Sequence, residues 1–333
     1  MRSEADLSMR VLLLFGGGEK GDAIRHARRI HMDFIHQLQH YVDFKVYGPG
    51  EYGRIADKEI CPLKYKSSRT APMLEHAFNP DVVLVYARGT VKSWLPKNFS
   101  KIKAKRVIIE VDYWAEADTV WPWYKNNFDL MIQRGYYRKS CMNAVWLPFS
   151  ASGEDFIPFQ NAEKTGDKVC FIGQSKIGLN NTSTTFYYKF RTRALRKLLS
   201  YGSVDNRGTV GHEKYSEVLG SYKYIFTDAA GVRHSPVAKV FEIMASGGLL
   251  LCNEIHAWQK LFGKDRPYVC YNDSLRDLVP QALRMLDGQY DNLIPKSKEV
   301  VMESHLDRHR IVELVEIMEA VVRERKIPRK WGN

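Results

Sequence analysis

The chain has 333 residues, of which 44% are hydrophobic and 26% are charged. This composition is typical of a folded globular protein and excludes a disordered one, and the length suits two domains of roughly 150 residues each. The formal net charge is +12, which favours an anionic partner without choosing among nucleic acid, a membrane surface and a smaller anionic ligand. No apolar run approaches the ~18 residues of a membrane-spanning helix.

The N-terminus and the cysteines bear on the cellular compartment. The first ten residues, MRSEADLSMR, include acidic side chains and no apolar segment, so we expect no secretory signal. The cysteines, at positions 61, 141, 170, 252 and 270, have no C-x-x-C spacing, and we interpret them as reduced thiols. The sequence therefore predicts a cytoplasmic protein without a transmembrane segment, for which peripheral contact with a membrane stays open.

In the first half of the chain, apolar runs of strand length alternate with helical segments. These runs lie at 11–15, 44–47, 82–86, 107–111 and 130–132, and the segment 22–42 has apolar residues at helical spacing. Near-continuously apolar strands are typical of parallel sheets that helices cover on both faces. This alternation predicts a doubly wound α/β domain over residues 1–150.

The same pattern restarts after a polar segment at 150–167, which we interpret as the domain boundary. The later strands are expected at 169–172, 224–227, 248–252 and 268–270, with helices at 186–200, 236–246 and 307–325. We therefore predict a second α/β domain over residues 166–333 that ends in helices.

The first strand of the chain runs into a glycine-rich loop, and FGGGEKG satisfies G-x-G-x-x-G. A dinucleotide site of the Rossmann type also needs an acidic residue at the end of the second strand, where this chain has Tyr47 and Gly48. The pattern therefore argues against NAD or FAD. Two interpretations of Gly16, Gly17 and Gly18 stay open: a tight turn, or a loop whose backbone N–H groups approach an anionic ligand.

The most specific stretch is HSPVAKVFEIMASGGLLLCNE, residues 234–254. Pro236 suits the first turn of a helix, where free backbone N–H groups can face a phosphate. Lys239 lies one turn into this helix and can add a positive charge. Glu242 follows on the same side, and its two oxygens can accept hydrogen bonds from ribose hydroxyls. An ordinary amphipathic helix with a solvated lysine and glutamate is the alternative interpretation.

This stretch resembles the donor-binding segment of group-1 glycosyltransferases with the GT-B fold, and especially that of the spore-maturation (CgeB-type) branch. The shared pattern is matched by Ser235, Pro236, Lys239, Phe241, Glu242, Ala245, Gly247 and Gly248. DKVCFIGQSK, residues 167–176, resembles the first strand of the family's second domain, whose following loop approaches the donor phosphates; Gly173 and Lys176 are the matching positions. LLLFGGG and VYGPG are similar to the family's N-terminal strand, glycine loop and second strand.

The resemblance implies two Rossmann-like domains facing a cleft, with C-terminal helices packing back toward the N-terminal domain. Residues 1–150 would bind the acceptor and residues 166–333 the nucleotide-sugar donor. The implied donor-binding residues are Gly16, Gly17, Gly18, Gly173, Lys176, Arg233, Ser235, Lys239 and Glu242. Many group-1 enzymes carry a further glutamate at the position of His234, so the sugar and the stereochemical outcome do not follow from the resemblance.

The sequence also bears on metal ions. The Asp-x-Asp motif that holds a metal in other glycosyltransferases is absent, and the nearest match is Glu110-Val-Asp112. We therefore expect catalysis without a metal or a cofactor, in which Lys176, Arg233 or Lys239 stabilises the leaving diphosphate. His305 and His309 have i, i+4 spacing but no third ligand nearby in sequence, so we interpret them as solvated surface histidines.

The acceptor hydroxyl needs a general base, which loops at the carboxyl ends of the first domain's strands would supply. Asp112, directly after a strand, is the first candidate, and His26 and Asp22 come next; a structural role for Asp112 stays open. Basic runs at 64–69 and 97–106 favour an anionic acceptor. It would be a phosphate-bearing glycan, lipid or polymer, or DNA with a hydroxymethylated base. In the aromatic segment 113–124, the tryptophans would either stack on sugars or bases or fill the core.

The sequence thus predicts a metal-independent, nucleotide-sugar-dependent glycosyltransferase with an anionic acceptor. The alternative is a nonenzymatic nucleotide- or DNA-binding module on the same scaffold, which would bind ligand without hydrolysing a donor sugar. An NAD-linked enzyme ranks third.

Overall fold

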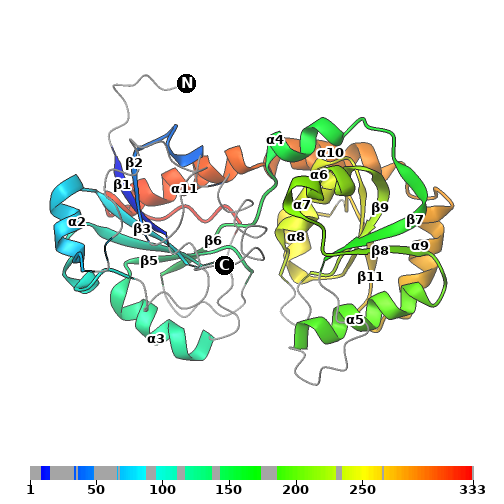
Figure 1. Ribbon diagram of the computed structural model, residues 1–333, viewed down its shortest axis with the longest axis horizontal. Coiled ribbons are helices and arrows are strands. Elements are labelled where there is room, and N and C mark those ends of the chain that lie inside the picture. Colours follow the sequence, from blue (N-terminus) through cyan, green and yellow to red (C-terminus); the bar gives the residue numbers. More distant parts are fainter. Residues whose placement is uncertain are drawn as a thin grey trace. The chain divides into compact units, whose positions relative to one another are not determined.

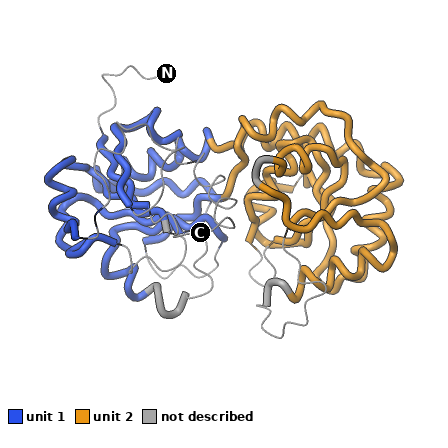
Figure 2. The backbone as a smooth tube through the Cα atoms, in the orientation of Figure 1, with its two compact units in different colours: residues 1–148, 308–333 blue, residues 149–307 orange. Residues whose placement is uncertain are grey.

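The structure is a computed structural model that describes residues 9–15, 34, 37–48, 66, 68–87, 95–110, 117–136, 143–173, 186–229, 235–264 and 266–331 (Figure 1). The chain divides into two compact units (Figure 2). The first unit comprises residues 1–148 and 308–333, and the second comprises residues 149–307.

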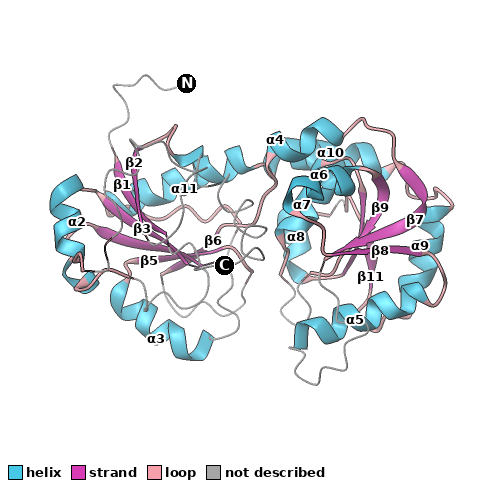
Figure 3. Cartoon of the chain, in the orientation of Figure 1, coloured by secondary structure: helices cyan, strands magenta, loops and turns pink. Residues whose placement is uncertain are grey.

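Within the described residues, the first unit contains a six-stranded parallel sheet with the strand order β2-β1-β3-β4-β5-β6 (Figure 3). The strands are β1 (Arg10–Phe15), β2 (Asp43–Tyr47), β3 (Val82–Ala87), β4 (Lys105–Glu110), β5 (Leu130–Gln133) and β6 (Ala144–Trp146). Their apolar residues are almost all buried, because helices cover a doubly wound sheet on both faces. The five strands expected in this half of the chain are confirmed, and β6 is an addition.

The helices of the first unit that the structure describes connect or cover these strands. They are α2 (Ala71–Phe78), the 3-10 helix η2 (Phe99–Lys101), α3 (Ala117–Asn127) and α11 (Asp307–Val322). Before α2, Thr70 forms an isolated bridge with Lys97, and the amide of Ala71 donates to the Lys97 carbonyl at 2.8 Å. This bridge places Thr70, which directly follows the basic run 64–69, beside Lys97, the first residue of the run 97–106.

The second unit contains a five-stranded parallel sheet in its described part, with the order β11-β10-β9-β7-β8. Its strands are β7 (Thr165–Ile172), β8 (Val204–Gly208), β9 (Tyr222–Phe226), β10 (Leu249–Asn253) and β11 (Val269–Tyr271). Around them the structure describes α4 (Gly153–Phe156), η4 (Ile157–Phe159), α5 (Phe186–Leu199), α6 (His212–Gly220), α7 (Ala238–Ala245), α8 (His256–Phe262), α9 (Leu278–Leu286) and α10 (Leu293–Ser304). The expected second α/β unit is confirmed.

Helices cover both faces of this second sheet. Residues of α5 and α9 share one hydrophobic cluster with Tyr224 and Phe226 of β9. The intervening residue, Ile225, points to the opposite face, where its side chain lies close to Ile243 of α7 and to Gly248. The α5 and α7 helices therefore pack on opposite faces of the sheet, as Figure 1 shows.

Two glycines make the turn from α7 into β10, and both are required by close packing. Gly247 has φ +77°, and a Cβ atom there would lie 2.7 Å from the Gln160 carbonyl oxygen. A Cβ atom on Gly248 would lie 2.8 Å from the Ile225 side chain. The glycine pair of the 234–254 segment therefore lets the helix, the strand and the backbone near Gln160 approach one another.

The unit boundaries differ from the expected division in two places. Residues 150–167, interpreted from their polarity as the domain boundary, are part of the second unit, because Phe156 is buried and packs edge-on against Tyr215 at 6.2 Å. Residues 308–333, expected with the second domain, belong to the first unit. There Glu324 pairs with Lys105 at 2.8 Å.

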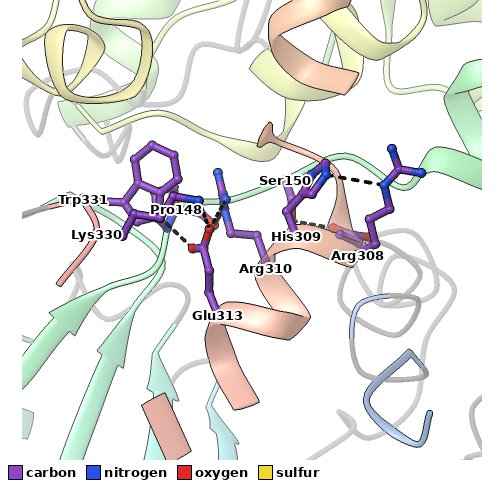
Figure 4. A network of polar contacts seen from close by, with 9 residues as sticks. Pro148, Ser150, Arg308, His309, Arg310, Glu313, Lys330 and Trp331 are labelled. Carbon is purple, nitrogen blue, oxygen red and sulfur yellow. Dashed lines mark hydrogen bonds and ion pairs between the residues drawn. The ribbon is translucent and has the colours of Figure 1, made fainter. Parts of the chain in front are cut away.

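The C-terminal tail is fastened to α11 by a buried polar network (Figure 4). Arg310 is 0% exposed; its Nε donates to the Pro148 carbonyl at 3.2 Å and its Nη1 to Glu313 at 3.1 Å. The Trp331 indole N–H donates to Glu313 at 2.8 Å, and the ring lies 4.5 Å from the Arg310 guanidinium. Lys330 also pairs with Glu313, at 2.8 Å. The charge of the buried Arg310 is thus balanced by the Glu313 carboxylate, which Lys330 and Trp331 cover.

The two histidines of the expected surface pair are not equivalent. His305 lies at the end of α10, is 1% exposed and stacks on Phe241 with ring centroids 5.1 Å apart. His309 lies in α11. The interpretation of both as solvated surface residues is therefore wrong for His305, because the aromatic rings packed around it exclude solvent. Among the described residues, no group of three or more His, Cys, Asp or Glu side chains is arranged to hold a metal ion.

Two further expectations concern cysteines and membranes. Of the cysteines that the structure describes, Cys170 and Cys252 are buried, Cys270 is partly buried and all three are free thiols. None of the helices in the described ranges combines the length and apolarity needed to cross a bilayer.

Candidate functional site

The candidate site lies where the strand order of the second sheet reverses. The chain leaves β7 to form β8 on one side and then returns to form β9 on the other side of β7. In open parallel sheets, ligands bind outside the carboxyl ends of the strands at such a switch point. Here those ends are Ile172 of β7 and Phe226 of β9.

Gly173 directly follows β7 and has a conformation that suits glycine alone. Its φ is +143°, and its amide donates to the Gly208 carbonyl at 2.7 Å. A Cβ atom at this position would lie 2.9 Å from the Lys239 Nζ. The glycine therefore makes room for the lysine ammonium at the end of the strand.

Lys239 reaches this point from α7. The half-buried side chain donates a hydrogen bond from Nζ to the Ile172 carbonyl oxygen. Burial lowers the pKa of Lys239 to about 8, and the positive charge of Arg191 acts in the same direction, while Glu242 and Asp228 oppose it. The site thus holds a cation whose charge a bound anion would stabilise.

Glu242 lies one turn further along α7 and is 1% exposed. Its Oε2 accepts a hydrogen bond from the Tyr215 hydroxyl of α6 at 2.7 Å. Its Oε1 has no hydrogen-bond partner among the residues that the structure describes. Burial raises the pKa of Glu242 to about 7, although the hydrogen bond from Tyr215 and the positive charge of Lys239 each lower it. Of the two oxygens expected to face ribose hydroxyls, one is therefore already bound to Tyr215 and the other remains as an acceptor.

A second charged pair lies beside Lys239. Asp228, two residues beyond β9, is fully buried, and its Oδ1 accepts a hydrogen bond from the Arg191 Nε of α5 at 2.5 Å. Its Oδ2 has no hydrogen-bond partner in the part of the chain that the structure describes. Sequence reasoning missed this pair. The signal was present, because an acidic residue just after an apolar strand, here in YIFTD, is the criterion that singled out Asp112.

At the end of the neighbouring strand β10, an amide side chain orders the backbone. Asn253 is fully buried; its Oδ1 accepts from the Ala229 amide at 2.8 Å, and its Nδ2 donates to Asp273 at 3.2 Å. The backbone just after Asp228 is thereby held to β10. The carboxyl ends of β9 and β10 are thus rigidly joined at the site.

The structure describes four of the expected site residues and brings three of them together. Gly173 and Lys239 meet at the switch point, Glu242 lies one turn further along α7 and close enough for its charge to act on Lys239, and Ser235 is buried in the segment before α7. The helix begins at Ala238 after Val237 as N-cap, so Pro236 precedes the first turn instead of lying within it. The remaining expected site residues lie outside the described residues: Gly16, Gly17, Gly18, Asp22, His26, Asp112, Lys176 and Arg233.

The first unit also has polar groups at the carboxyl ends of its strands. Glu110 ends β4, is fully buried and accepts a hydrogen bond from the Tyr124 hydroxyl of α3 at 2.8 Å. Trp123 packs against Tyr124 and Phe128 at ring distances of 5.8 and 5.9 Å. Of the interpretations left open for the aromatic segment, the core-packing one therefore holds for Trp123.

The comparisons with known proteins agree with this architecture. Residues 159–316 match the family model described as "Glycosyl transferase-like". No curated protein sequence matches the chain.

Among the similar solved structures, three that cover almost the whole chain illustrate the likeness. The sucrose-phosphate synthase of Thermosynechococcus elongatus shares 10% identity with a TM-score of 0.59, covering 95% of this chain and 100% of that one. HepE of Anabaena, solved with UDP and glucose, shares 10% identity with a TM-score of 0.57, covering 94% and 100%. An alpha-glucosyltransferase solved with UDP and a 13-mer DNA shares 9% identity with a TM-score of 0.61, covering 94% and 100%. The shared fold consists of two Rossmann-like units with parallel sheets, as in GT-B enzymes.

Proposed function

We propose that the chain is a GT-B glycosyltransferase that transfers a sugar from a nucleotide-sugar donor to an acceptor hydroxyl. Residues 159–316 match the glycosyl transferase-like family model, and the two units share the fold of the similar solved structures. The observation that carries this proposal is the placement of Gly173 and Lys239 at the switch point, with the buried Glu242 one turn further along the same helix, in the unit that matches the family model. The motif Ser235 to Gly248 further favours the spore-maturation (CgeB-type) branch, and the free cysteines favour a cytoplasmic location.

The second unit is proposed to bind the donor. The Lys239 ammonium supplies positive charge for the diphosphate, and the unpartnered Oε1 of Glu242 accepts a hydrogen bond from a ribose hydroxyl. A buried acceptor without a partner costs free energy that such a hydroxyl would recover. Two structures similar to this chain were solved with UDP, so UDP-sugars are the first donors to test.

Chemistry at this site is proposed to need neither a metal nor a cofactor. The leaving diphosphate carries the charge that develops during transfer, and cations fixed in the protein stabilise it. Lys239 supplies one such cation, and Lys176 and Arg233 of the family-like segments are proposed to supply others. Activity that is unchanged by a chelator such as EDTA would support this part of the proposal, and restoration by Mg²⁺ or Mn²⁺ would contradict it.

The first unit is proposed to bind an anionic acceptor. Lys66, Lys97 and Lys101 are exposed, and the Thr70–Lys97 bridge joins the two basic runs that contain them. Asp112 is the proposed base that takes the hydroxyl proton, with His26 and Asp22 as the next candidates. A surface glycan or phosphate-bearing polymer is the first acceptor class. DNA is the second, because one similar structure contains DNA and a basic surface suits it.

The donor experiment has two steps. A thermal-shift screen with UDP, GDP, ADP and dTDP sugars identifies the nucleotide, and release of free sugar from the donor then shows catalytic competence. Lys239→Gln should abolish both responses, whereas Lys264→Gln, an exposed lysine beyond α8, should leave them unchanged. Full activity of Lys239→Gln would contradict the proposed donor site. DNA-binding measurements over a range of salt concentrations separate the acceptors, since a DNA acceptor requires binding that weakens steeply with salt.

A further inference from the structure

The outer face of α5 carries a row of cations. Lys189, Arg193 and Arg196 are exposed, and because they are four and three residues apart they share one face of the helix. The inner face holds Leu195 and Leu198, which are buried in the hydrophobic cluster between α5 and the sheet (Figure 1). We refer to Lys189, Arg193 and Arg196 as the α5 basic row.

No opposite charge neutralises this row. The α5 helix contains five basic residues and no acidic one, whereas α6 and α10 contain residues of both signs. The other two cations of α5 have partners within the second unit: Arg191 bonds to Asp228, and Lys197 donates to the Leu275 carbonyl at 2.5 Å. The three residues of the row form no ion pair or side-chain hydrogen bond with any residue that the structure describes.

The stability of the helix does not account for the row. Like charges four residues apart, such as Lys189 and Arg193, repel each other and destabilise a helix. Arg196 lies near the C-terminal end, where the helix dipole favours a cation, but Lys189 lies in the first turn, where the dipole opposes one. A helix face that only contacts solvent normally interleaves the two signs. The row therefore calls for an anion outside the chain.

The spacing of the row suits a phosphodiester backbone. At 1.5 Å per residue, the row extends over about 10 Å, which corresponds to about three phosphates along one strand of duplex DNA. Arginine, which supplies two of the three cations, binds phosphate oxygens in pairs. A lipid surface also presents phosphates, but a helix that binds there inserts apolar side chains. The next residue on this face, Ser200, is exposed and polar.

We propose that the α5 basic row binds the sugar-phosphate backbone of double-stranded nucleic acid. The inference goes beyond the proposed function, which assigns acceptor binding to the first unit and leaves the class of acceptor open. Contacts to phosphates position a protein on a duplex without reading its sequence. The second unit therefore binds nucleic acid irrespective of sequence, and the attraction weakens as salt is added.

Fluorescence anisotropy with a labelled DNA duplex of about 20 base pairs tests this assignment over about 50 to 200 mM NaCl. A second arm uses an RNA duplex of the same length. Each phosphate contact that is lost should reduce the slope of log K against log[salt] by about 1. Arg193→Gln should therefore reduce the slope by about 1 and weaken binding about three- to tenfold at about 100 mM NaCl. The row variant, with all three residues changed to glutamine, should reduce the slope by about 2–3 and weaken binding at least about thirtyfold.

The control variant removes the same net charge elsewhere in the second unit. Lys168, Lys214 and Lys264 are exposed, and changing all three to glutamine should leave the salt slope unchanged and duplex binding within about threefold of the wild type. Equal losses in the row variant and the control variant would show that binding follows net charge alone, and would overturn the assignment. Circular dichroism and thermal melts verify that both variants are folded, which the exposure of all six side chains leads us to expect.

The remaining outcomes decide between nucleic acid and a membrane. The inference is overturned if the row variant binds both duplexes as the wild type does, or if the wild type binds neither. Sedimentation with phosphatidylserine–phosphatidylcholine vesicles is the competing arm. If the wild type binds these vesicles but no duplex, and the row variant loses the vesicles, the row contacts a membrane and the nucleic-acid assignment is wrong.

The result is independent of the donor experiment. Duplex binding through the row, in a chain that neither responds to any nucleotide sugar nor releases sugar from one, would overturn the proposed function and leave this inference standing. A response to nucleotide sugars without duplex binding would do the reverse. The row variant should keep the wild-type response to the donor, because its three side chains lie on the exposed face of α5.

Discussion

Replacing Glu242 by glutamine is expected to stabilise the unliganded protein. Burial raises the pKa of Glu242 from 4.5 to about 7, which corresponds to a penalty on the order of 3 kcal/mol against the ionised form. Glutamine has no charge and keeps a partner for Tyr215. The amide has two polar groups, and the one that does not bond to Tyr215 takes the buried position of the unpartnered Oε1. Burying this polar group without a partner costs about 1–2 kcal/mol of folding free energy. The net gain at pH 8 is therefore about 1–2 kcal/mol, or about 2–6 °C in Tm.

The sign of the pH dependence follows from the direction of this shift. Because the folded-state pKa of Glu242 is raised, its destabilising effect is absent below pH 4.5, where both states hold the proton. The effect grows as the pH rises and is complete above about pH 7. The stability difference between Glu242→Gln and the wild type should therefore increase from pH 4.5 to pH 7 and then stay constant.

Thermal melts at several pH values, with and without UDP, measure both consequences. UDP should raise the Tm of the wild type more than that of Glu242→Gln, because a ribose hydroxyl loses its charged acceptor while the diphosphate keeps Lys239. Glu217→Gln, an exposed glutamate of α6, is the matched control and should change neither the pH dependence nor the UDP response. If Glu242→Gln melts below the wild type at pH 8, or if the difference does not change with pH, the reasoning about the buried carboxylate is refuted.

Three other predictions address neighbouring features. Since the pKa of Lys239 is lowered to about 8, UDP affinity should fall about tenfold between pH 7 and pH 9, and Lys239→Gln should flatten this titration profile. Gly173→Ala places a Cβ atom 2.9 Å from the Lys239 ammonium at a φ of +143°. Calorimetry should therefore show weaker UDP binding, and thermal melts should show that the free energy of unfolding falls by about 1–3 kcal/mol. Unchanged UDP binding would contradict the tight fit. Trp331→Ala removes the hydrogen bond to Glu313 and uncovers Arg310, and should lower stability by about 1–3 kcal/mol. Tyr201→Ala, at a 62% exposed side chain, should be nearly neutral in the same melts.

Much of the fold could be predicted from local patterns in the sequence. Apolar runs separated by amphipathic segments located nine of the eleven strands that the structure describes, all except β6 and β8. They were sufficient to predict the parallel α/β class of both units. The helix and the glycine turn of the 234–254 segment could also be predicted, because a helix followed by Gly247 and Gly248 is a local arrangement. Its residues Lys239 and Glu242 are close together in the sequence, and their common helix face follows from helical spacing alone.

The partners of these residues depended on the order of the strands, which no local pattern encodes. Tyr215 lies 27 residues before Glu242, and Arg191 lies 37 residues before Asp228. These pairs form only when the sheet is assembled, with β9 beside β7 and the helices of the unit packed on it. Likewise, the sequence predicted a helix at 307–325, but its assignment to the first unit was decided by tertiary packing. Periodicity specifies which face of an element is buried, whereas the element that covers it is chosen by the fit of the whole core.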